Sequence, residues 1–229
     1  MARHLYELCG ADPDRVFSPF CWRSRMALAH KGLDFESIPW RFTETDRLAF
    51  AQHAKVPVLV DGDRTVADSW TIARYLDEAY PDRPSLLHGR PEPYRFVAAW
   101  NDAVLQPGIA RLIVSDIPPL LREAERSYFV ASREKRFGMT LDQVTADREQ
   151  KLPAFRATLQ PLRLALAHGP FLGGDAPDYA DYIVFGSFMW ARSTSPLSLL
   201  EEGDVVLVWR ERLLDLHGGM ARRSPCFGA

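Results

Sequence analysis

The stretch KVPVLVDGDRTVADSWTIARYLDEAY, residues 55–80, decides the predicted fold of the first part of the chain. Two apolar and β-branched runs flank Asp61-Gly62, a pair typical of tight turns, and this pattern predicts a β-hairpin over 56–68. Apolar residues at helical spacing then continue up to Pro81, which predicts a helix over 69–80. The stretch therefore reads as a hairpin followed directly by a helix.

The residues before this stretch complete a small α/β unit. Residues 3–9 and 34–40 are short runs with aromatic and aliphatic side chains, and both predict strands. Residues 20–31 contain good helix formers and end at Gly32, which is typical of the position after a helix. The predicted order is β-α-β, a loop, and then β-β-α.

The composition changes after residue 80. Residues 81–92 are rich in Pro and Gly, so we predict a linker at 83–92 between a domain at 1–82 and a domain at 93–229. Beyond the linker the pattern predicts only helices. They are expected over 94–114 with a kink at Pro107, 120–137 ending at Gly138, from a Thr140–Gln143 capping box to His168 with bends at Pro153 and Pro161, from Asp178 to about Arg192, and over 204–217.

Composition excludes several classes of protein. Hydrophobic residues make up 47% and charged residues 25% of the chain, so a folded globular protein is expected rather than a disordered one. The formal net charge of −2, without a basic stripe, argues against nucleic-acid binding. The chain contains no run of about 18 apolar residues, so no membrane span is predicted. The three scattered cysteines favour a cytoplasmic protein, and the dispersed histidines indicate no metal site.

The first motif that carries chemistry is Ser18-Pro19-Phe20-Cys21-Trp22-Arg23, between the first strand and the first helix. A hydroxyl there lies beside a helix N-terminus, where free N–H groups and the helix dipole favour an anion such as a thiolate. The alternative is that Ser18 only caps the helix, and on this motif alone the cap is favoured.

The second motif is Lys55-Val56-Pro57-Val58-Leu59. A cis bond before Pro57 would turn the backbone of Val56 outward, where its N–H and C=O could pair with an extended peptide. The alternative is a trans proline that opens an edge strand, which is the commoner case.

The third motif is Asp68-Ser69, at another strand-to-helix junction. Asp68 can accept from an ammonium group, and Ser69 can donate to a carboxylate, so together they suit the free end of an α-amino acid. The alternative is again a plain helix cap. No single motif excludes its alternative, but all three are predicted at loop ends on one edge of the small sheet.

In order and spacing, these motifs resemble the cytosolic glutathione transferases over essentially the whole chain. The resemblance implies an α/β thioredoxin-like domain that binds glutathione as co-substrate, an all-α domain for the second substrate, and a homodimer. Ser18 stands at the position of the family's catalytic Tyr, Ser or Cys. The family also implies that Val56-Pro57 is the cis-proline strand, that Asp68-Ser69 clamps the γ-glutamyl group, and that Lys55 and Trp40 flank the cysteinyl-glycine end.

Two branches of the family share finer features with the chain. SPFCWRSRMAL (18–28) resembles the Ser-x-x-x-Trp-Arg-x-Arg segment of zeta-class isomerases, although Pro19-Phe20 replaces the Ser-Cys found there. SPFCWR together with SREKRFGMTLDQVTADREQKLP (132–153) is more similar to the bacterial β-aryl-etherase-like branch and its fungal relatives.

The resemblance implies that the Ser18 hydroxyl stabilises the glutathione thiolate, which attacks an apolar or aromatic electrophile, with aryl-ether cleavage as one candidate reaction. We expect the second-substrate pocket between the domains, with Phe20, Tyr94 and Trp100 as walls. The alternatives are a non-catalytic binding module, a zeta-like isomerase, and a thiol-disulfide enzyme using Cys21, although Cys21 is expected to be a small core residue.

Overall fold

A computed structural model describes residues 2–227, so the outermost predicted domain limits, 1 and 229, lie outside it. Its N-terminal part contains a four-stranded mixed sheet in the order β2-β1-β3-β4. Strand β1 pairs parallel with β2 and antiparallel with β3, which places Leu5 between Ser37 and Leu59. The strands are β1 Arg3–Leu8, β2 Glu36–Trp40, β3 Val58–Asp61 and β4 Arg64–Ala67.

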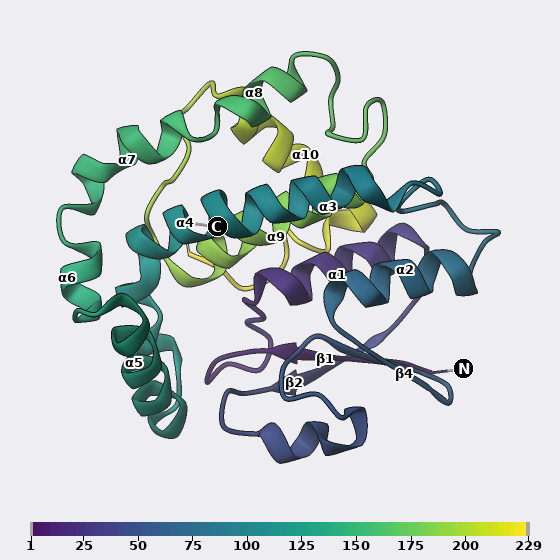
Figure 1. The fold of residues 1–229 in the computed structure, drawn as a ribbon, viewed down its shortest axis with the longest axis horizontal. Coiled ribbons are helices and arrows are strands. Elements are labelled where there is room, and N and C mark those ends of the chain that lie inside the picture. Colours follow the sequence, from purple (N-terminus) through teal and green to yellow (C-terminus); the bar gives the residue numbers. More distant parts are fainter. Residues whose placement is uncertain (1, 228–229) are drawn as a thin grey trace.

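Two helices cover the face of the sheet that is turned toward the rest of the chain. These are α1, Pro19–His30, and α2, Ser69–Ala79, which lie side by side above the strands in Figure 1. The short 3-10 helix η1, Thr45–Ala51, lies beyond the other face. The predicted β-α-β, loop, β-β-α order is therefore confirmed.

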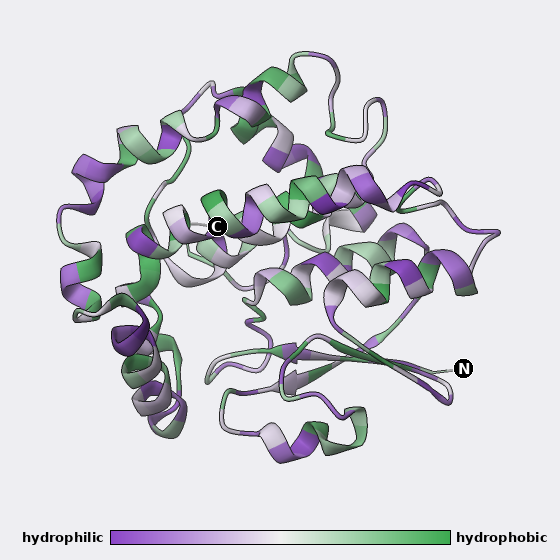
Figure 2. Ribbon diagram, in the orientation of Figure 1, coloured by the Kyte–Doolittle hydropathy of each residue, from purple (hydrophilic) through white to green (hydrophobic). Residues whose placement is uncertain are grey.

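The remainder of the chain is helical. Residues 80–90, all of which are described, form turns that lead into this part. Hydrophilic residues interrupt the outer helices α5 and α7 in Figure 2, as expected where one face meets water. The helices are α3 Pro91–Trp100, η2 Asn101–Leu105, α4 Gln106–Ile113, η3 Val114–Asp116, η4 Pro118–Leu120, α5 Glu123–Phe137, α6 Leu141–Thr145, α7 Arg148–Ala157, α8 Gln160–Leu166, α9 Tyr179–Thr194 and α10 Val205–Gly219.

Helix α9 is the centre of the helical part, and nearly all of its side chains are buried. It begins at the predicted Asp178 with a capping box, in which Asp178 accepts from Ala180 N–H and Asp181 accepts from the N–H of Asp178. Asp181 also accepts from the indole of Trp209 at 2.7 Å, so the start of α9 is tied to α10. The buried polar groups at this junction are paired, as a packed core requires.

Prolines shape the helices differently from the prediction. The kink expected at Pro107 takes the form of the π-helical turn η2, immediately before α4. The segment after Thr140 does not break at Pro153, which lies inside α7. It is divided at Asp147, which has a left-handed backbone, and again just before α8, where Pro161 occupies the first turn and needs no hydrogen-bonded N–H, so the bend predicted at Pro161 is present. Within residues 2–227, none of the helices combines the length and apolar character needed to cross a membrane.

Candidate active site

A cavity of about 580 Å³ lies between the N-terminal sheet and the C-terminal helices. On one side it is lined by the loop before α1, the end of β2 and the residues just before β3, and on the other by α4, α5 and α9. Five of the predicted site residues line it: Ser18, Phe20, Trp40, Lys55 and Val56. The structure thus gathers residues that are 38 positions apart in sequence around one space.

Ser18 is the N-cap of α1. Its hydroxyl oxygen accepts from the N–H of Cys21 at 3.3 Å, and the side chain is almost fully buried at the wall of the cavity. Because the oxygen acts as acceptor in this contact, the hydroxyl hydrogen remains available, and among residues 2–227 it meets only the weakly accepting sulfur of Cys21 in the same turn. Ser18 therefore does cap the helix, and its hydroxyl remains as a hydrogen-bond donor beside the positive end of the helix dipole.

The Val56–Pro57 peptide bond is cis, as the family resemblance implied. The carbonyl of Pro57 accepts from the N–H of Asp68 at 3.1 Å, which links this segment to the start of α2. Among the described residues, no hydrogen bond engages the N–H or the C=O of Val56. An extended peptide lying along this edge can therefore pair with both groups.

Asp68 and Ser69 lie next to this edge rather than in the wall of the cavity. Asp68 caps α2, with Oδ1 accepting from the N–H groups of Trp70 and Thr71 at 2.9 and 3.1 Å. Its other carboxylate oxygen, on an exposed side chain, has no hydrogen-bond partner among residues 2–227. Ser69 is buried, and its carbonyl accepts from the hydroxyl of Tyr179 at 2.7 Å. Oδ1 of Asp68 thus serves as a plain helix cap, as the alternative interpretation held, and Oδ2 remains available for a ligand.

The two remaining polar candidates differ in availability. The indole N–H of Trp40 already donates to the carbonyl of Glu44 at 2.8 Å, so this residue offers the cavity its ring rather than a hydrogen bond. Lys55 is exposed, and no carboxylate in the described part of the chain pairs with it. Its ammonium group is consequently free to meet an anionic ligand.

Aromatic side chains from both sides of the cavity form much of its lining, and of these only Phe20 and Trp40 were predicted from the sequence. Phe42 packs against Phe17, Tyr128 and Phe129, with ring centroids 5.6–6.3 Å apart. Phe137 and Trp190 complete the set, and Phe20 contributes from the start of α1. Such a wall suits a flat apolar or aromatic ligand. The close spacing of Tyr128, Phe129 and Phe137 on one predicted helix was the available signal.

Tyr94 and Trp100, predicted as pocket walls, do not line the cavity, and this prediction is wrong. Both belong to α3, whereas the cavity meets the same helical segment beyond the π-helical turn, at Gln106 and Ala110 of α4. Tyr94 is buried in the core and its hydroxyl donates to Asp178 at 2.8 Å, while Trp100 packs against the core.

Helix α5 is joined to the sheet side by a polar bridge that spans the rim of the cavity. Thr43, just beyond β2, donates to Glu125 of α5 at 2.8 Å, and Arg122, at the N-cap position of α5, donates to Glu44 at 3.2 Å. Hydrogen bonds from Arg122 and then from Thr43 lower the pKa of Glu125 to about 2, against the opposing effect of burial. The aromatic wall on α5 is thereby fixed opposite Ser18.

Cys21 is fully buried, and burial raises the pKa of its thiol to about 12. The thiol is therefore protonated at neutral pH and poorly suited to thiol exchange. The expectation of a small core residue is confirmed.

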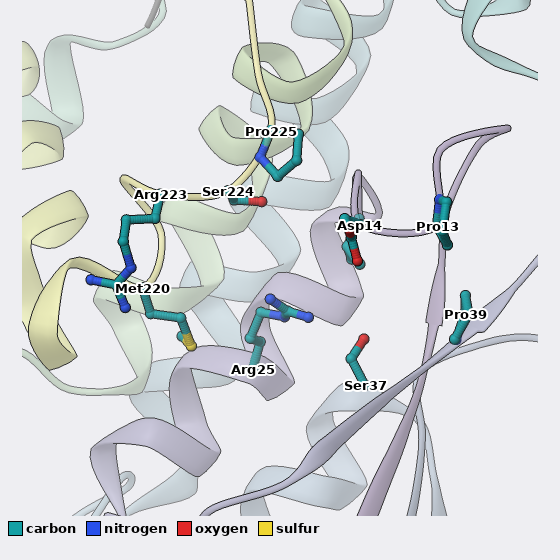
Figure 3. A pocket seen from close by; sticks show the side chains of 10 residues that line it. Pro13, Asp14, Arg25, Ser37, Pro39, Met220, Arg223, Ser224 and Pro225 are labelled. Carbon is teal, nitrogen blue, oxygen red and sulfur yellow. The ribbon is translucent and has the colours of Figure 1, made fainter.

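A second cavity, of about 260 Å³, is bounded by the loop before α1 and the C-terminal residues (Figure 3). Its cations are already engaged. Arg25 forms a bidentate pair with the buried Glu7, and Arg223 donates to the carbonyl of Gly218. The cavity between the sheet and the C-terminal helices, with its free donor and cations, is the better candidate for the active site.

A thioredoxin-like sheet with a cis-proline edge, followed by a helical part, defines the class of the protein, and comparison with known proteins gives its family. The family model for the glutathione S-transferase C-terminal domain matches residues 94–216, and that for the N-terminal domain matches residues 17–79. The chain belongs to the glutathione S-transferase family. The predicted fold and the prediction of a glutathione S-transferase are thereby confirmed.

Individual relatives agree with this assignment. Glutathione S-transferase U22 of Arabidopsis thaliana is 25% identical over 184 residues, 79% of this chain and 73% of that protein. Glutathione S-transferase Z1 of the same plant is 42% identical over 88 residues, 32% of this chain and 40% of that protein. The crystal structure of CsGST63524 of Ceriporiopsis subvermispora, in complex with glutathione, is 22% identical, with a TM-score of 0.81 over 95% of this chain and 97% of that one. At this identity, the last likeness concerns the fold.

Proposed function

We propose that this protein activates glutathione as a thiolate with the hydroxyl of Ser18 and directs the thiolate to an apolar or aromatic electrophile. The observation that carries the proposal is the uncommitted hydroxyl hydrogen of Ser18, at the N-terminus of α1, in a cavity whose opposite wall is aromatic. Serine in this role stabilises charge and forms no covalent bond with the substrate.

Glutathione, in this proposal, lies extended along the edge formed by Val56 and Pro57. Val56 offers an N–H and a C=O without protein partners, and the free oxygen of Asp68 with Ser69 receives the γ-glutamyl end. Lys55 offers an unpaired cation to the glycyl carboxylate, and the ring of Trp40 flanks the same end. This arrangement brings the sulfur of the tripeptide toward Ser18.

The reaction is a substitution at carbon. The sulfur lone pair forms an S–C bond, the bond from that carbon to the leaving group breaks, and the thiol proton passes to solvent. With an aryl ether as substrate the leaving group is an aryloxide, which is the reaction that the etherase-like sequence features suggest. With an aryl halide the leaving group is a halide.

The test is a kinetic and structural comparison. A crystal of the complex should show the glutathione sulfur within hydrogen-bonding distance of Ser18 Oγ, and the protein should turn over at least one member of a panel containing an aryl halide and a model β-aryl ether. Retention on glutathione-agarose without turnover of any panel member would instead support a non-catalytic module. Turnover of a maleyl substrate without net consumption of glutathione would support a zeta-like isomerase.

We also propose that the protein is a homodimer, on the strength of its family membership. Sedimentation at micromolar concentration is expected to give twice the mass of one chain. A single-chain mass throughout the concentration range would contradict this.

A further inference from the structure

Two arginines of α5, Arg133 and Arg136, line the same cavity as the aromatic residues. The guanidinium of Arg133 lies over the rings of Phe129 and Phe42, with its central carbon 4.6 and 5.4 Å from their centroids. Its orientation is therefore fixed by stacking rather than by an ion pair. The only hydrogen bond that it makes to residues 2–227 goes from Nη1 to Ser132 Oγ, at 2.9 Å.

Neither of these arginines has an acidic partner among the described residues. The contrast with the same helix is direct, because Arg122 pairs with Glu125 at 2.8 Å and Arg126 pairs with Glu123 at 3.5 Å. On α5, the arginines outside the cavity have carboxylates and the arginines that line it have none.

The surroundings of Arg133 make this cation unfavourable without an anion. Burial lowers its pKa; the nearby Tyr128 opposes this effect, and the like charge of Arg136 adds a smaller lowering. A partly buried cation without a counter-charge costs free energy, which a bound anion offsets. Guanidinium groups bind carboxylates through paired N–H donors, and stacked aromatic rings accept a further aromatic ring beside them.

We propose that Arg133 and Arg136 form an anion subsite, so that the second substrate is an aromatic electrophile that carries a carboxylate. This rests on the proposed function, since it identifies the class of molecule that glutathione meets in the cavity. The ring lies against the aromatic wall, the carboxylate meets the two arginines on α5, and the electrophilic carbon faces the thiolate at Ser18. Lys55, on the sheet side of the cavity, remains for glutathione.

The experiment compares 4-chloro-3,5-dinitrobenzoate with the corresponding benzamide, which differ in charge and share the leaving group. In both, sulfur bonds to the ring carbon, the C–Cl bond breaks and chloride leaves. Each kcat/KM is divided by the uncatalysed rate constant of the same compound with glutathione. The wild-type protein is expected to favour the acid about tenfold or more, equivalent to about 1.4 kcal/mol.

The variants locate the preference. Arg133→Gln and Arg136→Gln are each expected to lose most of the preference for the acid. The loss should come from a lower kcat/KM for the acid, while kcat/KM for the amide changes less than about twofold. Arg133→Lys, which keeps the charge, should retain part of the preference. Lys135→Gln is the matched control, because it removes one positive charge from the same helix at a position outside the cavity. If the wild-type protein shows the same corrected kcat/KM for the acid and for the amide, the proposal is overturned without reference to any variant.

Binding separates this proposal from the proposed function. If neither chloride is turned over, calorimetry with the unreactive 3,5-dinitrobenzoate and 3,5-dinitrobenzamide decides. If the acid binds more tightly than the amide and this difference depends on Arg133, the anion subsite is supported even though the proposed transferase activity fails. If the acid and the amide bind equally, the subsite is overturned. Should Arg133→Gln weaken glutathione as much as it weakens the acid, the arginine holds the co-substrate and the proposal is wrong.

Discussion

Replacing Ser18 by Ala tests the proposed function most directly, because the hydroxyl has two separable roles. It accepts from Cys21 N–H as the cap of α1, and its own hydrogen is free for the glutathione sulfur. The variant loses both contacts. The loss of the cap should lower the free energy of unfolding by about 1 kcal/mol, and the loss of the donor should raise the pKa of the bound thiol.

The size of the pKa change follows from the strength of one hydrogen bond to a charged group. Such a bond contributes about 1.5–3 kcal/mol, which corresponds to about one to two pKa units. If hydroxyl and helix dipole together bring the thiol from about 8.5 to about 6.5, Ser18→Ala should return it to about 7.5–8.5. At about pH 6.5 the thiolate fraction then falls from about one half to about 1–10%, and kcat falls about 5- to 50-fold.

The assay is the pH dependence of kcat, supported by ultraviolet titration of the thiolate in the binary complex. Above about pH 9.5 both proteins should approach the same rate, since both thiols are ionised there. Thr140→Ala is the matched control, because Thr140 caps α6 by accepting from Gln143 N–H at the same 3.3 Å and lies outside the cavity. It should lose similar stability and keep the wild-type profile. An unshifted pH profile in Ser18→Ala, with glutathione still bound, would refute the mechanism.

Other expectations concern buried groups away from the sulfur. Cys21→Ala should keep kcat/KM within about twofold, because its thiol stays protonated; a large loss would favour the thiol-disulfide alternative. Arg25→Met should lower the free energy of unfolding by about 3 kcal/mol or more in urea, because the fully buried Glu7 would lose its bidentate partner; an unchanged midpoint would contradict this. Burial lowers the pKa of His30 from 6.5 to about 4, so the unfolded chain binds this proton at higher pH than the folded one. The contribution of His30 to the free energy of unfolding should be fully present above pH 6.5 and should be lost as the pH falls toward 4. Urea unfolding of His30→Gln should therefore show a shallower decline with falling pH than the wild-type protein, and equal slopes would contradict this.

Local signals in the sequence were sufficient for the α/β part and for the starts of two helices in the helical part. The turn at Asp61-Gly62, the stop at Gly32 and the capping boxes at Thr140 and Asp178 all act through neighbouring residues, so each could be recognised from a few positions. The cis bond at Pro57 is different, because base rates favour trans and only the resemblance to the family implied it. The fold therefore followed from local chemistry together with the order of the motifs.

The far wall of the cavity could not be derived in this way. Its residues come from α4, α5 and α9, and their meeting depends on where α5 lies relative to the sheet. That position is set by contacts such as Thr43 to Glu125, which join residues 82 positions apart. The same limit explains the error at Tyr94 and Trp100, because helical spacing identified apolar side chains without indicating which end of the segment meets the cavity.

The geometry around Ser18 depends on the helical part as much as on the sheet. Gly186 of α9 faces the first turn of α1, and a Cβ added there would overlap the carbonyl of Pro19. Gly10, at the other end of the same loop, lies so close to the carbonyl of Leu120 that a side chain is excluded there as well. Both ends of the loop that carries Ser18 are thus held by C-terminal backbone. Because Leu120 lies shortly before α5, its contact with Gly10 ties the loop that carries Ser18 to the segment that leads into the aromatic residues of α5. The packing of the two halves therefore helps to set the separation between the two proposed substrates.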